Sequence, residues 1–351
     1  MWTSFSSNAI LAKAMTMYGR HLDAPEYTDL LHCPTVTDVA VYLKKKPAYA
    51  KTLASMSETT VHRGQLEALL KAKLFDDFAA LCRYELSVGK RFSDYLIRRG
   101  EINQILSVLR LLSAGRSHEY LSALPLFFNR HTELDLFSLA KVKTFAAFLD
   151  ALGHSKYRSI IEKCCPDESV PPDFNLIENA LFIYLYTGVF AIIRKHVRGE
   201  EKEELLAVFG QQVDLLNMLR IDRLKRYFHA SSDMVRSMII PFHYKIPPRV
   251  LNEMIEAHSA DDAFDLFRRT SYRKILEKHL FENPDDFANR CQYDLCRKKM
   301  YFSTHASVVM LSYIFLAEIE LENMVKIIEG IRYGLPQKEI AGMLIGYEKK
   351  T

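Results

Sequence analysis

The chain has 351 residues, 49% of them hydrophobic and 26% charged, which is typical of a soluble globular protein with two or three domains. Its 13 glycines and 12 prolines are few for a turn-rich β architecture, and a net charge of +4 is too small to indicate nucleic-acid binding. The 6 cysteines include no CxxC pair, so neither a zinc site nor a disulfide framework is expected.

The N-terminal sequence MWTSFSSNAILAKAM has no basic residue before its apolar stretch and no small-residue cleavage site, so no secretory signal is predicted. The longest stretches without charge, residues 179–193 and 300–317, are shorter than the roughly 20 apolar residues of a membrane span. We therefore expect a cytoplasmic protein in which these two stretches are buried core helices.

Helix signals occur along the whole chain. Thr35 with Asp38, and Ser259 with Asp262, have capping-box spacing, and each pair precedes an apolar run. Between residues 101 and 112 apolar side chains recur every three or four positions, which places them on one helical face. The sequence Asn-Pro-Asp-Asp at 283–286 predicts a helix that begins at its proline. No period-two pattern of strand length is evident, so an all-α fold is predicted.

Three segments of the chain resemble one another, and each has an apolar helix, a polar elbow and then a tyrosine that opens another helix. The tyrosines are Tyr49, Tyr157 and Tyr272, separated by 108 and 115 residues. Because a ring can be buried while its hydroxyl reaches a polar partner, we interpret these tyrosines as structural.

A second landmark repeats with nearly the same period. Asn103, Asn217 and Asn323 lie in apolar helical segments, 114 and 106 residues apart. These asparagines could contact a ligand, but an asparagine in such a setting more often bonds backbone where helices cross. The first copy departs from the acid-x-x-Asn pattern of the other two.

A period near 110 residues is large enough for a small helical domain, and much longer than the repeats of solenoid proteins. The sequence therefore predicts a pseudo-threefold repeat of three similar helical domains in series, over residues 1–131, 132–247 and 248–351. The two boundaries lie where polar residues or paired prolines interrupt the helical pattern.

Signatures of catalysis are scarce, since no glycine-rich phosphate loop, GxSxG elbow or HExxH helix is present. Asp261, Asp262 and Asp265 spell DDxxD, which in isoprenoid synthases holds Mg²⁺ bound to a diphosphate. An all-α prenyl-synthase-like enzyme is thus the catalytic alternative. Against it, the motif follows the expected cap Ser259, where first-turn acids are favoured by the helix dipole, and no second acidic motif completes a metal cluster.

Three segments carry a family resemblance: SNAILAKAMTMYGRHLDAPEYTDLL, VDLLNMLRIDRLKRYF and ENMVKIIEGIRYGLPQKEI. Together they resemble the C subunits of the V-type and A-type ATPases, the counterparts of the eukaryotic d subunits, over essentially the whole chain. The resemblance implies a funnel-shaped adaptor of three helical domains in the central stalk of a rotary ATPase.

The resemblance also implies partners. One end of the funnel would receive the rotor shaft, formed by the D and F subunits, and the other would rest on the membrane proteolipid ring, at the cytoplasmic face and without a membrane span of its own. Such an adaptor transmits torque, and it has no catalytic residue, cofactor or metal. A general helical scaffold, unconnected to any ATPase, is the remaining alternative from the sequence.

Overall fold

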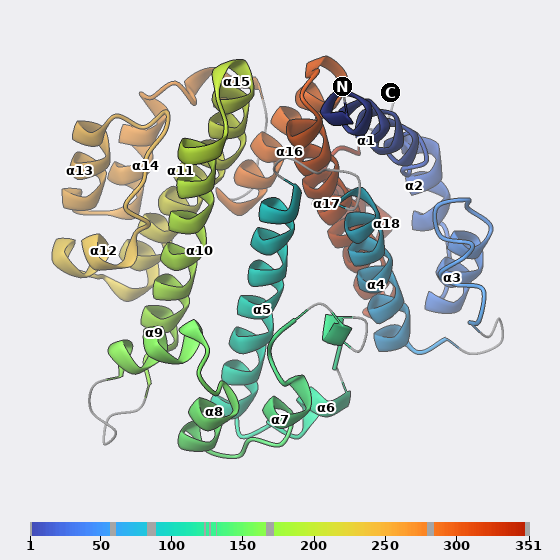
Figure 1. Cartoon of the computed structure of the whole chain (residues 1–351), viewed down its shortest axis with the longest axis horizontal. Helices are drawn as coiled ribbons and strands as arrows, with labels where there is room; N and C mark the ends of the chain where they lie inside the picture. Colours follow the sequence, from blue (N-terminus) through green and yellow to red (C-terminus); the bar gives the residue numbers. More distant parts are fainter. Residues whose placement is uncertain are drawn as a thin grey trace. The chain divides into compact units, whose positions relative to one another are not determined.

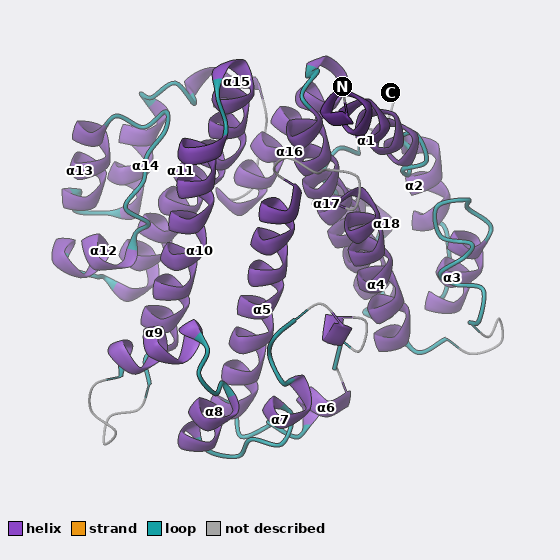
Figure 2. Cartoon of the chain, in the orientation of Figure 1, coloured by secondary structure: helices purple, strands orange, loops and turns teal. Residues whose placement is uncertain are grey.

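The computed structural model describes residues 2–56, 61–82, 89–122, 124–125, 128–130, 132–165, 172–278 and 284–347. Within these ranges every regular element is a helix, which confirms the predicted all-α class (Figures 1 and 2). The chain divides into two compact units, unit 1 with Met1–Lys90 and Phe281–Thr351, and unit 2 with Arg91–Leu280. Both predicted domain boundaries fall inside unit 2, so the division into three domains stays a prediction.

Unit 1 is formed by the two ends of the chain, which pack around one long helix. Its helices are α1 (Trp2–Tyr18), α2 (Ala24–Leu31), α3 (Val36–Lys44), α4 (Arg63–Cys82), α16 (Pro284–Phe302), α17 (Ala306–Arg332) and α18 (Gln337–Met343). Helix α17 packs against α1, α3, α4, α16 and α18. Residues 306–316 of α17 are all buried, because a helix that is apolar on every side needs neighbours all round. The expected start of α16 at its proline is confirmed.

Unit 2 is continuous in sequence, and α11 is its central helix. Its elements are α5 (Gly89–Ser113, in unit 2 from residue 91), α6 (Glu119–Ser122), the 3₁₀-helix η1 (Phe128–Arg130), α7 (Leu136–Leu139), α8 (Phe145–Ala151), α9 (Lys156–Cys164), α10 (Phe174–His196), α11 (Gly199–Phe228), α12 (Ser232–Met238), α13 (Pro248–Glu256), α14 (Ala260–Arg268) and α15 (Arg273–Lys278). Helix α11 packs against α10, α12 and α14. Of the described helices α10 alone is long and apolar enough to cross a membrane, and 44% of its most apolar window is buried in the protein.

Three short helices begin with the same cap. Thr35, Thr144 and Ser259 precede α3, α8 and α14, and each side-chain oxygen accepts the amide three residues later, at 3.2, 3.2 and 3.0 Å. The caps predicted at Thr35 and Ser259 are therefore confirmed, and Asp38 reaches back to the Thr35 amide at 3.2 Å to complete its capping box. The tyrosines Tyr49, Tyr157 and Tyr272 follow these caps by 14, 13 and 13 residues.

Two helical glycines lead to opposite predictions. A methyl group at Gly210 of α11 would lie 2.6 Å from both Cβ and Cγ of Tyr244, whereas nothing lies within 4 Å of one at Gly342 of α18. We expect Gly210→Ala to lower the free energy of unfolding by about 1 to 3 kcal/mol. The added methyl group would clash with Cβ and Cγ of Tyr244, which cannot move away without a shift of the backbone. Gly342→Ala should raise it by roughly 0.5 kcal/mol through helix propensity. Urea unfolding of both variants checks this, and equal effects would contradict it.

Candidate functional site: three buried junctions of a carboxylate and a tyrosine

The three repeat tyrosines each donate their hydroxyl to a carboxylate that is at most 6% exposed. Tyr49 bonds Glu320, Tyr157 bonds Glu101 and Tyr272 bonds Asp214. The carboxylates lie on the long helices α17, α5 and α11. Because a buried carboxylate is costly unless it is hydrogen-bonded, the other donors to each oxygen decide what these junctions can do.

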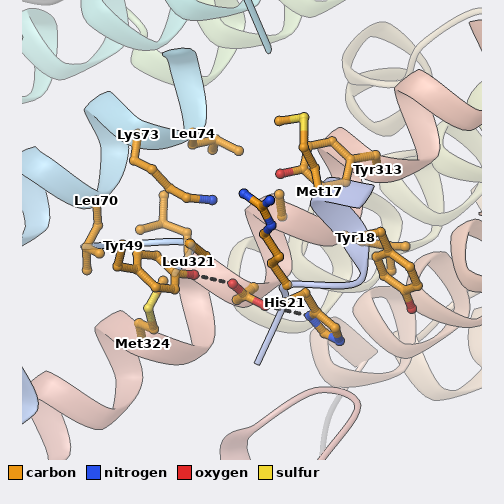
Figure 3. Close-up of a pocket in the computed structure, with 15 residues that line it drawn as sticks. Met17, Tyr18, His21, Tyr49, Leu70, Lys73, Leu74, Tyr313, Leu321 and Met324 are labelled. Carbon is orange, nitrogen blue, oxygen red and sulfur yellow. Dashed lines mark hydrogen bonds and ion pairs between the residues drawn. The ribbon is translucent and has the colours of Figure 1, made fainter. Parts of the chain in front are cut away.

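The first junction joins the two ends of the chain within unit 1. Besides the Tyr49 hydroxyl, Glu320 accepts the Leu22 amide at 2.9 Å and contacts His21 Nδ1 at 2.5 Å. Figure 3 shows Tyr49 and His21 each joined by a dashed line to the carboxylate between them. The residue after Leu22 is Asp23, the cap of α2, so Glu320 fixes the point where the chain enters that helix.

The surroundings of Glu320 favour its charged form. Burial raises the pKa of this carboxyl, but the hydrogen bond and charge of His21, with the bonds from Tyr49 and Leu22, outweigh burial and hold the pKa below its usual value. Burial and the Glu320 charge raise the pKa of Tyr49 well above normal, so its hydroxyl stays protonated. A cavity of about 20 Å³ beside the junction has room for one water molecule.

The second junction lies in unit 2, between α5 and the start of α9. Glu101 accepts the Tyr157 hydroxyl at 2.6 Å, the Thr132 hydroxyl at 2.7 Å and the Glu133 amide at 3.1 Å. Burial and the bond to Glu101 raise the pKa of Tyr157. The segment 132–134 that Glu101 holds leads into α7, capped by Asp135, just as the segment held by Glu320 leads into α2.

The third junction is the most completely bonded. Asp214 accepts the amides of Tyr244, Lys245 and Ile246 at 2.9, 2.6 and 3.2 Å, and the Tyr272 hydroxyl at 3.0 Å. Burial raises the pKa of Asp214, although these four bonds oppose the rise. The segment 244–246 leads into α13, so this carboxylate also holds the chain before a short helix.

Two of the predicted asparagines lie three residues after a junction carboxylate and bond backbone. Asn217 donates to Ile240 O at 2.9 Å and accepts the Ile240 amide at 2.8 Å. Asn323 makes the same pair of bonds with Ile345, at 2.8 and 2.9 Å. Both amides are 1% exposed. They cross-link the long helix to a later segment.

Asn103 does not share this geometry, because its side chain is exposed. The residue three positions after Glu101 is Gln104, whose Oε1 accepts the Tyr120 hydroxyl at 2.9 Å. Gln104 therefore has the same spacing from Glu101 as Asn217 has from Asp214 and Asn323 from Glu320, whereas Asn103 does not. The acid-x-x-amide spacing could have shown this in the sequence, since Glu101 lies three residues before Gln104.

The three aspartates of the DDxxD motif lie on α14, and each has a different bonding partner. Asp262 accepts the Ser259 hydroxyl at 2.7 Å at the helix cap, Asp261 pairs with Arg226 at 2.8 Å, and Asp265 lies 3.5 Å from Arg268. Asp261 and Asp265 are 83% and 62% exposed at the side chain. These bonds give each carboxylate the capping or surface role that its place in the first turns of a helix predicts.

The bonds of the junctions hold helices in place. Their carboxylates already accept three or four donors from the protein, and burial raises the pKa values of Tyr49 and Tyr157 away from neutrality. Each junction connects a long helix to two places on the chain. One is the segment that precedes a short helix, and the other is the tyrosine that follows the next short helix along the chain. Directional bonds of this kind, shielded from water, make a stiff connection.

Comparison with known proteins identifies the family of the chain. Residues 10–343 match the family described as the ATP synthase (C/AC39) subunit. The C subunits of the A-type ATP synthases of Methanobrevibacter smithii and Methanothermobacter thermautotrophicus are each 21% identical, over 93% and 95% of this chain and 85% and 86% of theirs. That of Methanosphaera stadtmanae is 22% identical over 63% of this chain and 57% of its own length. The chain belongs to the C/AC39 family of ATP synthase subunits.

Proposed function

We propose that this chain is the non-catalytic socket of a rotary ATPase, which couples the D–F shaft to the proteolipid ring and transmits torque at the cytoplasmic face of the membrane. Membership of the family over residues 10–343 supports the assignment to such a complex. The assigned role needs no cofactor or metal. The protein would attach through its partners and would not span the membrane.

The observation that carries the proposal is the order in which the junctions pair. With the predicted domains 1–131, 132–247 and 248–351, the carboxylate of each domain bonds the tyrosine of the next, and Glu320 of the last domain bonds Tyr49 of the first. Three equivalent connections in cyclic order are what a pseudo-threefold repeat of linked domains would need. They support a repeat in which each domain is joined to its successor by a buried polar contact.

A torque-transmitting part must resist twisting between its domains. Apolar packing is non-directional and permits sliding, whereas a carboxylate held by three or four donors fixes both distance and orientation. The junctions of Glu101, Asp214 and Glu320 supply such contacts on each of the long helices α5, α11 and α17. This is the reason to expect a stiff adaptor here, in place of a flexible scaffold.

Affinity purification tests the proposal. The tagged chain is expressed in its native cells, membranes are solubilised in mild detergent, and the co-purifying proteins are identified by mass spectrometry. We expect the D and F subunits of the shaft together with the proteolipid, and cross-linking then places each partner on the chain. Recovery of the chain alone, with no other part of an ATPase, would overturn the proposal.

A further inference from the structure

Two separate segments of the chain carry cationic residues and no acidic ones. Residues 1–22 and 295–317 contain no aspartate or glutamate. Their cations are Lys13, Arg20, Arg297, Lys298 and Lys299. These 5 charges exceed the net charge of +4, so the remainder of the chain is slightly acidic. The segments are 273 residues apart, which raises the question of whether the fold brings them together.

The fold does join them, at one end of unit 1. The rings of Tyr18, the last residue of α1, and Tyr301, in the last turn of α16, meet edge to face at 5.9 Å. Arg297 interacts electrostatically with both tyrosines. We name this surface the basic aromatic tip, defined as Arg297, Lys298, Lys299, Tyr301 and Phe302.

The tip presents its aromatic rings to solvent from a fixed support. Phe302 is 78% exposed and Tyr301 58%, while Met300 beside them is fully buried and anchors the helix end. The turn to α17 is closed by a bond from the His305 amide to Ser303 Oγ at 3.2 Å. Cations in the last turn of a helix are expected from its dipole, but that effect does not account for an exposed phenylalanine beside them.

The end of α11 is an internal comparison with a similar sequence. It also finishes on two cations, a tyrosine and a phenylalanine, at residues 225–228, and Phe228 is 60% exposed. There, however, Arg226 forms ion pairs with Asp222 at 2.9 Å and Asp261 at 2.8 Å. The two helix ends differ in sequence: residues 295–302 of α16 contain no aspartate or glutamate, whereas residues 221–228 of α11 include Asp222.

We propose that the basic aromatic tip binds the surface of an anionic lipid bilayer, with Phe302 entering the headgroup region and the cations facing the phosphates. This goes beyond the proposed function, which needs only protein partners. Two features favour a bilayer over an acidic protein. Lysine is depleted in protein interfaces yet supplies two of the three cations here, and a protruding ring can enter the soft surface of a bilayer.

Sedimentation with lipid vesicles tests the inference on the whole chain. We expect binding to phosphatidylcholine vesicles that contain phosphatidylserine, weak binding to pure phosphatidylcholine, and loss of binding at high salt. Arg297→Gln combined with Lys298→Gln should weaken the partition coefficient by about 30-fold, which corresponds to ~1 kcal/mol for each cation. Phe302→Ser should weaken it by about tenfold, since a phenyl ring leaves the interface.

The matched control is Phe228→Ser at the end of α11, which should leave vesicle binding unchanged. Thermal unfolding followed by circular dichroism confirms that each variant is folded. Absence of phosphatidylserine-dependent binding by the unmodified chain overturns the inference, and so does an equal loss from Phe228→Ser and Phe302→Ser. If the tip variants bind vesicles normally but lose a co-purifying acidic protein, the tip is a protein interface and the lipid assignment is wrong.

Discussion

Asp214→Ala is expected to lower the free energy of unfolding by about 4 kcal/mol, because it leaves the amides of residues 244–246 and the Tyr272 hydroxyl without their acceptor. Each buried donor without a partner costs about 1 to 3 kcal/mol, and relaxation of the segment or entry of water recovers part of the sum. Urea unfolding followed by circular dichroism measures the change.

Asp222→Ala is the matched control, on the same helix two turns later. Asp222 is also buried, at 6% exposed, but its bonds go to Arg226, which keeps a second partner in Asp261. We expect this variant to cost roughly 1 kcal/mol. If both variants lose the same stability, loss of a buried carboxylate alone explains the effect, and the three-amide junction adds nothing.

Glu320→Ala is expected to have an effect of similar size on unit 1, about 3 to 4 kcal/mol. The substitution removes the acceptor of the Tyr49 hydroxyl and the Leu22 amide and the ionic partner of His21. Glu329→Ala is the control on the same helix α17, since Glu329 pairs with Arg63 at a half-exposed site and should cost about 0.5 kcal/mol. A loss below 1 kcal/mol for Glu320→Ala would contradict the structural role of the junction.

The contribution of Glu320 should also depend on pH with a defined sign. Because its pKa in the folded chain lies below the usual value, the charged carboxylate stabilises the fold at pH values above the unfolded pKa of about 4.3. That stability is lost as the pH falls through the folded pKa. The difference in unfolding free energy between the unmodified chain and Glu320→Gln should therefore shrink below about pH 4. A difference that is constant from neutral pH into this range would argue against an ionised Glu320.

Local structure followed closely from the sequence. The caps at Thr35 and Ser259, the start of α16 at its proline and the all-helical class depend on contacts within a few residues, which the sequence displays directly. The three tyrosines were selected in the sequence by their repeated spacing; each of them bonds a buried carboxylate, and the repeat itself stays a prediction. The exposed position of Asn103 could not be predicted from the sequence. Asn103 and Gln104 are neighbours along the chain, and only the packing of the helix decides which of the two side chains faces the protein.

The junctions themselves could not be derived from the sequence. A repeat identifies equivalent residues, but it does not say whether a tyrosine bonds a carboxylate of its own copy or of another. Tyr49 and Glu320 are 271 residues apart, and Tyr157 lies 56 residues after Glu101. Long-range pairing of this kind is decided by how the helices pack, and the acids carry no local signal that they are buried.

Because Tyr49 pairs with Glu320, the order of synthesis and the order of assembly cannot coincide. The nascent polypeptide emerges from the ribosome with its first 90 residues lacking the helix that completes their unit, while residues 91–280 contain all that unit 2 needs. Unit 2 can therefore fold while translation continues, and the N-terminal segment must wait for nearly the last residues. Ribosome-bound chains that stop before residue 320 would present that segment, with its unsatisfied tyrosine, to chaperones.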